Sequence, residues 1–364
     1  MKYRLLAYLL VFYYQIAAQE QASTSSYNLD INYTSGNITL HNDGILHLIT
    51  GHPEGVIIGV NRKTFGKERW QQEYKYPDLG ASFIYQDLKN EHLGKNIGLY
   101  GHYNFYFFNR NLMFRIGQGV ALTSNPYNRE TNHKNNAFGS KLLSSTFLML
   151  NYRKERVLNK FGFQTGLSVV HYSNANVKAP NTSINILAFN AGITYNFEES
   201  VDERIETSFE KFTEPWKYNF VFRSGVNESD IIGSGQFPFY ILSGYADKRL
   251  SYKSAIQFGV DVFFSNFLKE FNRYQAIAFP DRNYDPDRDY KRLGLFIGHE
   301  LFINKLSVVT QAGYYAYYPV DFEGRLYLRA GLKRYFGKQW FGAITVKAHG
   351  AAAEAVEFGI GIRL

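Results

Sequence analysis

The strongest constraint on the fold is a series of stretches in which apolar side chains occupy every second position. Ile256, Phe258 and Val260, for example, alternate with Gln257 and Gly259. This period of two indicates a β-strand with two different faces. Strands of about ten residues with one apolar face and one small or charged face are typical of a barrel that faces lipid on its outside. We therefore predict an all-β fold, an antiparallel transmembrane β-barrel of about 14–16 strands.

The candidate strands share this alternation and are separated by turn-forming residues. They are 44–50, 55–63, 79–88, 96–108, 112–123, 142–156, 161–174, 183–197, 216–228, 237–249, 254–266, 291–303, 306–318, 325–336, 340–349 and 355–364. If both ends of the chain lie on the periplasmic side, the number of strands must be even. We prefer one large barrel. The alternative is two tandem barrels of about eight strands each, joined by 198–215.

The N-terminus predicts export from the cytoplasm. Lys2 and Arg4 precede a short apolar run that ends at Ala18, the pattern of a signal peptide cleaved after about residue 18. Residues 19–43 are rich in Ser, Thr and Asn, which indicates a flexible, exposed segment. The predicted organisation is a signal peptide at 1–18, the N-terminal segment at 19–43 and the barrel at 44–364, divided into 44–197 with the candidate site, 198–215 as a charged link and 216–364 as additional strands.

The connections between the candidate strands are of two lengths, and the two kinds alternate. The short turns are 109–111, 157–160, 250–253, 304–305 and 337–339, and the longer loops are 124–141, 175–182, 267–290 and 319–324. Outer-membrane barrels place short turns toward the periplasm and long loops toward the outside. The hairpin formed by 171–185 is therefore expected at the outer leaflet.

This hairpin carries the residue types of a serine hydrolase. His171 and Ser173 share one face of a strand, and Asn185 falls on the same lipid-facing parity of the next strand. Ser173 would be the nucleophile, His171 the general base, and Asn185 the residue that orients the imidazole. Asn174 or Asn181, with backbone N–H groups of the loop, would bind the oxyanion and position the substrate.

Composition narrows the class of partner. The net charge of +8 suits an anionic partner, and export argues against nucleic acid, so a phosphate-bearing lipid is the better candidate. The acidic run from Asp281 to Asp289 begins like a calcium loop. Pro286 and Arg292, however, occupy the positions of its turn glycine and its bidentate Glu. We therefore predict a solvated loop there, no metal and no cofactor.

A short motif around the hairpin is shared with a known family. It consists of His171-Tyr172-Ser173-Asn174-Ala175, Lys178, Pro180-Asn181 and Ile184. These residues resemble the PagL lipid A deacylases, also described as acyloxyacyl hydrolases, and the general resemblance extends over about 44–197. The third triad residue, a Glu in the best-known members, falls on Asn185. Outer-membrane phospholipase A, a second family with His-x-Ser-Asn, is similar in using an Asn at this spacing.

The resemblance implies a carboxylic ester hydrolase in the bacterial outer membrane that removes a fatty acyl chain from lipid A or lipopolysaccharide. The expected partners are this lipid substrate and the membrane, and a homodimer is left open. A phospholipase A is the alternative with the same chemistry. A non-enzymatic porin or binding barrel is the alternative from another class, because the inner face of a large barrel can hold water.

Overall fold

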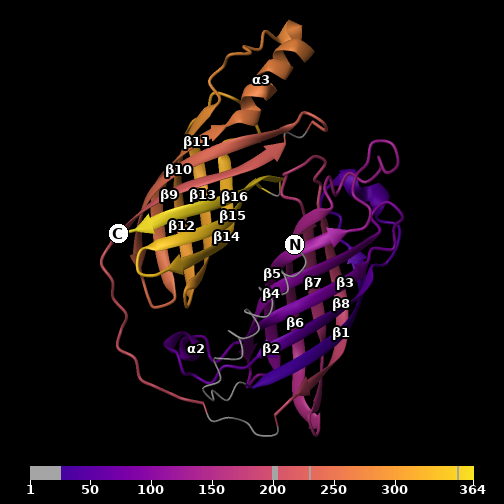
Figure 1. Cartoon of the computed structure of the whole chain (residues 1–364), viewed down its shortest axis with the longest axis vertical. Coiled ribbons are helices and arrows are strands. Elements are labelled where there is room, and N and C mark those ends of the chain that lie inside the picture. The colour runs from indigo at the N-terminus through magenta and orange to yellow at the C-terminus, as the bar shows by residue number, and fades with distance from the viewer. Residues whose placement is uncertain (1–25, 199–203, 229–230, 351) are drawn as a thin grey trace, which may run out of the picture.

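The chain forms two closed antiparallel barrels of eight strands each (Figure 1). The structure is a computed structural model, and it describes residues 26–198, 204–228, 231–350 and 352–364. The predicted signal peptide at 1–18 lies outside the described residues. The first barrel contains β1 (Tyr27–Ile38), β2 (Glu54–Arg62), β3 (Asp78–Asp87), β4 (Lys95–Phe107), β5 (Leu112–Thr123), β6 (Leu142–Leu158), β7 (Phe161–Ser173) and β8 (Ile184–Asn196).

The second barrel begins after the link and ends at the C-terminus. It contains β9 (Lys217–Glu228), β10 (Gln236–Arg249), β11 (Ser254–Ser265), β12 (Lys291–Ile303), β13 (Leu306–Tyr317), β14 (Leu326–Phe336), β15 (Trp340–His349) and β16 (Ala352–Arg363). The helical elements are η1 (Asp43–Leu48), α2 (Arg69–Glu73), α3 (Asn266–Ala278) and η2 (Pro280–Arg282). None of the helices in the described ranges is long and apolar enough to cross a membrane.

The predicted class, an all-β antiparallel barrel, is confirmed, but the preference for one large barrel was wrong. β1 pairs with β8, and β9 pairs with β16, so each half of the chain closes on itself. The alternative of two tandem barrels is the arrangement found. Alternation could not separate the two arrangements, because it fixes the face on which each side chain lies and not which strands meet at the closing seam.

The N-terminal part of the barrel prediction also needs correction. Residues 27–38, which the sequence placed in a flexible segment, form β1, and most of 44–50 forms the 3-10 helix η1 rather than a strand. The inward face of β1 carries Asn28, Asp30 and Asn32, all fully buried. Such polar residues are also typical of loops, which is why this stretch was interpreted as a flexible segment. Ile31 and Tyr33 on the outward face complete the alternation.

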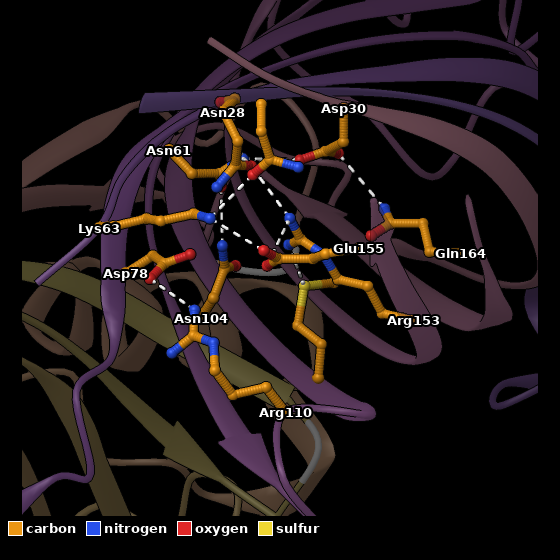
Figure 2. A network of polar contacts seen from close by, with 12 residues as sticks. Asn28, Asp30, Asn61, Lys63, Asp78, Asn104, Arg110, Arg153, Glu155 and Gln164 are labelled. Carbon is orange, nitrogen blue, oxygen red and sulfur yellow. Dashed lines mark hydrogen bonds and ion pairs between the residues drawn. The ribbon is translucent and has the colours of Figure 1, made fainter. Parts of the chain in front are cut away.

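Ion pairs cross the lumen of the first barrel. Asp30 on β1 accepts hydrogen bonds from the guanidinium of Arg115 on β5, the strand opposite, at 2.6 and 3.1 Å. Asn61 and Asn104 bond to each other and to Arg115, and Figure 2 shows these two asparagines and Asp30 within the polar network of this barrel. Buried charges need such partners, since an isolated charge is strongly disfavoured in a low dielectric.

The second barrel is filled in the same way. The guanidinium of Arg329 donates to Asp261 at 2.8 Å and to Glu357 at 2.6 Å. Arg292 on β12 pairs with Glu354 on β16, again across the lumen, at 2.7 Å. Paired side chains therefore occupy the interior of both barrels, which does not favour the porin alternative.

The barrels contact each other at the end that carries the short turns. The hydroxyl of Tyr74 donates to the carbonyl of Phe302 at 2.8 Å, and the ammonium of Lys253 donates to the carbonyl of Glu73 at 3.1 Å. The described part of the predicted link runs between them without regular structure. There the N–H of Ile205 bonds to the first barrel at Phe65. The two barrels are thus held side by side rather than joined by a free tether.

We expect Arg115→Met to lower the free energy of unfolding by about 3–5 kcal/mol, because Asp30 would become a buried charge without its partner. The measurement is the urea midpoint of the protein in lipid vesicles. Lys89→Met is the matched control. Its ion pair with Glu54 is exposed, so its loss should cost less than about 1 kcal/mol. Equal midpoints for the two variants would contradict the role given to the lumen pair.

Candidate functional site

The β7–β8 hairpin places His171 and Asn185 opposite each other. The two residues are direct register partners on neighbouring strands. Leu187 and Phe189 follow Asn185 on the same exposed face of β8, whereas Tyr172 is buried in the lumen. His171 and Asn185 therefore lie on the outward face of the barrel, as the alternation predicted.

A hydrogen bond of 2.6 Å joins Nδ1 of His171 to Oδ1 of Asn185. Because the amide oxygen can only accept, Nδ1 carries the proton in this arrangement. The lone pair of the neutral imidazole is then at Nε2, on the far side of the ring from Asn185. This is the tautomer that a general base requires.

Ser173 lies at the end of β7 and is almost buried, with 4% of its surface exposed. Its hydroxyl donates to Oδ1 of Asn181 at 3.1 Å and accepts the backbone N–H of Ala175 at 2.9 Å. Among the described residues, no hydrogen bond joins Ser173 to His171. The structure thus forms two adjacent pairs, His171 with Asn185 and Ser173 with Asn181, rather than one continuous chain.

Asn174 and Asn181 have different positions in the loop that follows Ser173. The Asn174 amide donates to the carbonyl of Lys178 at 2.6 Å and accepts the N–H of Asn176 at 3.0 Å, so it folds the loop. The backbone N–H of Asn174 donates to Oδ1 of Asn181 at 2.9 Å, which fixes the oxygen of that amide toward the strand end. The NH2 group of Asn181 is then directed elsewhere. Of the two side-chain amides, that of Asn181 bonds to Ser173, through its oxygen, whereas that of Asn174 bonds only within the loop.

The backbone of this loop is unusual and is held from outside. Ala175 and Asn176 have φ of 49° and 60°, the left-handed region that residues with a Cβ rarely adopt. The loop between β5 and β6 supports it, since Gly139 N–H donates to the carbonyl of Pro180 at 2.7 Å. His41, which follows β1, approaches the carbonyl of Thr182 at 3.0 Å. Contacts made by other loops therefore stabilise the conformation that surrounds Ser173.

Two further polar residues extend the site across the outer face, and the sequence interpretation missed them. Gln118 on β5 pairs in register with Thr146 on β6, and Thr146 pairs with His171. Thr146 donates its hydroxyl proton to Gln118, whose amide donates to Ser144 at 3.3 Å. A polar residue at a lipid-facing position is costly. The sequence therefore contained a signal for these residues: Gln118 in 112–123 and Thr146 in 142–156 are polar residues at outward positions of the two strands that precede the hairpin.

The part of the chain that the structure describes shows no group of three or more His, Asp or Glu side chains able to hold a metal ion. The acidic segment considered as a calcium loop lies between α3 and β12. Within it, Asp285 accepts the backbone N–H of Asp287, and Asp289 accepts that of Lys291. These carboxylates thus bond to the backbone of their own loop.

Comparison with protein families decides the identity of the chain. Residues 54–194 match the model of the lipid A 3-O-deacylase (PagL) family, and residues 216–364 match the model of the acyloxyacyl hydrolase C-terminal domain. The first match runs from β2 into β8 and the second spans the second barrel, so that together they cover most of the chain. The chain belongs to the PagL family. The predicted resemblance is confirmed, and it extends beyond the first barrel.

Other comparisons add little. The chain is similar to a doubly substituted mutant of Rh. blastica porin at 9% identity, with a TM-score of 0.21, covering 94% of this chain and 100% of that one. A triple mutant of Rhodopseudomonas blastica porin gives 7% identity and a TM-score of 0.19, with 94% and 100% covered. These scores are too low to carry an argument. No curated protein matches the chain.

Membership of the PagL family settles the reaction class. The protein is an ester hydrolase that acts on lipid A, as the sequence predicted. Lipid A or lipopolysaccharide is therefore its substrate. The family and the barrel fold are those of outer-membrane proteins.

Proposed function

We propose that the PagL-type protein hydrolyses the acyl ester of lipid A with Ser173 as nucleophile, His171 as general base and Asn185 as the residue that orients His171. The hydrogen bond between Nδ1 of His171 and Oδ1 of Asn185, on the outer face of the barrel, is the observation that carries this assignment. It leaves Nε2 as the basic nitrogen, two residues before a serine at the end of the same strand.

In the first step the oxygen of Ser173 attacks the carbonyl carbon of the ester, and its proton passes to Nε2 of His171. For this step the Ser173 hydroxyl must first turn from Asn181 toward the imidazole. Catalytic hydrogen bonds are often formed fully only when the substrate is bound. The tetrahedral intermediate then collapses. The bond to the sugar oxygen breaks, that oxygen takes the proton from His171, and the acyl chain stays on Ser173.

Water completes the reaction. His171 removes a proton from a water molecule, whose oxygen attacks the acyl carbon, and the second intermediate releases the fatty acid and restores Ser173. The N–H of Ala175 is a donor that lies beside Ser173. The Asn181 amide faces Ser173 with its oxygen, and a half-turn of this amide would bring its NH2 group to the negative oxygen. One such donor is typically worth about 3 kcal/mol in the transition state.

The position of the site supports a membrane lipid as the substrate. Exposed apolar side chains such as Leu167 and Phe189 lie below the hairpin on the same outward faces, so the acyl chain of a lipid can lie along the barrel wall while its ester reaches Ser173. With short turns toward the periplasm, this end lies in the outer leaflet of the bacterial outer membrane. A phospholipid ester would fit the same geometry.

Ser173→Ala and His171→Ala should each abolish acyl release, because they remove the nucleophile and the base. Mass spectrometry of lipid A and of phospholipids, from cells with and without the protein, measures which pool loses an acyl chain. Retention of the heat-modifiable shift on gels controls for folding. Release of acyl chains at the normal rate by Ser173→Ala would exclude the mechanism, and loss from phospholipids would make the protein a phospholipase A.

Asn185→Asp should keep or raise activity, and Asn185→Ala should lower it. A carboxylate also accepts the Nδ1 proton, and its charge-assisted bond is about twice as strong as a neutral one. The gain is expected to reach about 5- to 10-fold in kcat, since about 1 kcal/mol separates the two kinds of bond. Steady-state kinetics with a lipid ester in detergent micelles measures this. Full activity in Asn185→Ala would remove the residue from the site.

Asn181→Ala should lower kcat by about 100- to 1000-fold, the usual effect of losing one oxyanion donor. Asn181→Asp sharpens the test because a carboxylate can still accept from Ser173 and from the Asn174 N–H but has no N–H to donate. Both variants should lose activity to a similar degree. If Asn181→Asp were as active as the parent, the donor would have to be sought elsewhere in the loop.

A further inference from the structure

The second barrel contacts the loop that carries Asn181. The turn between β9 and β10 lies at the long-loop end, and Glu228 is the last residue of β9. Its backbone N–H donates to the carbonyl of Asn176 at 3.1 Å, and one oxygen of its carboxylate accepts the N–H of Ala179 at 2.9 Å. Gln236, the first residue of β10, donates to the carbonyl of Val177 at 2.7 Å. Three hydrogen bonds therefore join the second barrel to 176–179.

Glu228 is itself firmly held. The residue is 4% exposed, and the other oxygen of its carboxylate accepts the N–H of Gly233 at 2.8 Å and of Gly235 at 3.4 Å. Both glycines have positive φ, 82° and 98°, which brings their N–H groups round to the carboxylate. One buried carboxylate thus ties the turn of the second barrel to the loop of the first.

The contacted segment lies between the two residues that set the geometry of Ser173. Asn174 precedes it and Asn181 follows it. The oxygen of Asn181 accepts hydrogen bonds from the Ser173 hydroxyl and from the Asn174 N–H, and the Asn174 amide donates to Lys178. The left-handed backbone at Ala175 and Asn176 is a conformation that persists when its surroundings hold it. The carbonyl of Asn176 accepts the N–H of Glu228, and the N–H of Ala179 donates to the carboxylate of Glu228, so the second barrel supplies the partners of both groups.

We propose that Glu228 is a positioning residue for the deacylase reaction, and that the second barrel serves as a brace for the catalytic loop of the first. This inference rests on the proposed function of Ser173 and Asn181. Glu228 does not touch the reacting atoms. It acts through 176–179, holding Asn181 where its amide faces the nucleophile.

The test is a kinetic comparison of the full-length protein in micelles of a lipid ester. Glu228→Ala should lower kcat by at least about 10-fold while KM changes by less than about twofold, because a loosened loop misplaces the oxyanion donor without altering lipid binding. Gln236→Ala, at an exposed position, should lower kcat by a smaller factor of about threefold. Glu228→Gln, which keeps one acceptor oxygen, should recover part of the loss.

A double variant separates positioning from a general effect on stability. If Glu228 acts through Asn181, then Glu228→Ala added to Asn181→Ala should cause little further loss, whereas independent effects would multiply. Glu270→Ala on α3 is the matched control, an exposed carboxylate of the second barrel that pairs with Arg273 on its own helix. Native heat-modifiable migration should accompany each variant.

Parental kcat in a natively migrating Glu228→Ala variant would overturn the proposal, and so would multiplied losses in the double variant. A raised KM with unchanged kcat would overturn it as well and would instead mark a substrate contact. If Ser173 is not the nucleophile, the result is different, because Ser173→Ala would then remain active. An enzyme that needs Ser173 but not Glu228 disproves the brace alone.

Discussion

Closure of each sheet on itself is the constraint on which the rest of the structure depends. A strand in lipid has no water to satisfy its backbone, so a sheet edge in the membrane must be paired. The seam between β1 and β8 provides that pairing for the first barrel, and the seam between β9 and β16 provides it for the second. Once the barrel is closed, every second side chain faces lipid. The β7–β8 hairpin therefore carries His171 and Asn185 on the outer face of the barrel.

An eight-stranded barrel leaves an interior that side chains can fill, and this chain fills it with charge. The pairs Asp30 with Arg115 and Arg292 with Glu354 join opposite walls. These ion pairs connect opposite strands through the lumen. The polar residues on the outer face, which form a row on β5 to β8, take no part in them and are available for another role.

The strands of the site could be predicted closely, but β1 and the loop around Ser173 could not. The expected 161–174 and 183–197 correspond to Phe161–Ser173 and Ile184–Asn196, because apolar outward residues alternate there with small or polar inward ones. β1 escaped detection because its polar inward residues find their partners on distant strands, which a local pattern does not show. Which amide of the loop faces Ser173 also lay beyond the sequence. That choice depends on two left-handed residues and on contacts from other loops and from Glu228 of the second barrel.

The use of Asn185 in place of a carboxylate has a physical consequence for this location. A carboxylate on the lipid-facing wall would lose hydration and would repel the negatively charged headgroup of a phosphate-bearing lipid. The described hydrogen bonds of His171, Ser173 and Asn185 involve no acidic side chain. The hydrogen bond to Asn185 fixes the tautomer of His171 without adding a negative charge. In the proposed mechanism it would support the imidazolium of the transition state less strongly than a carboxylate would. In the proposed mechanism an amide at this position favours approach of an anionic substrate, whereas a carboxylate would favour a stronger base.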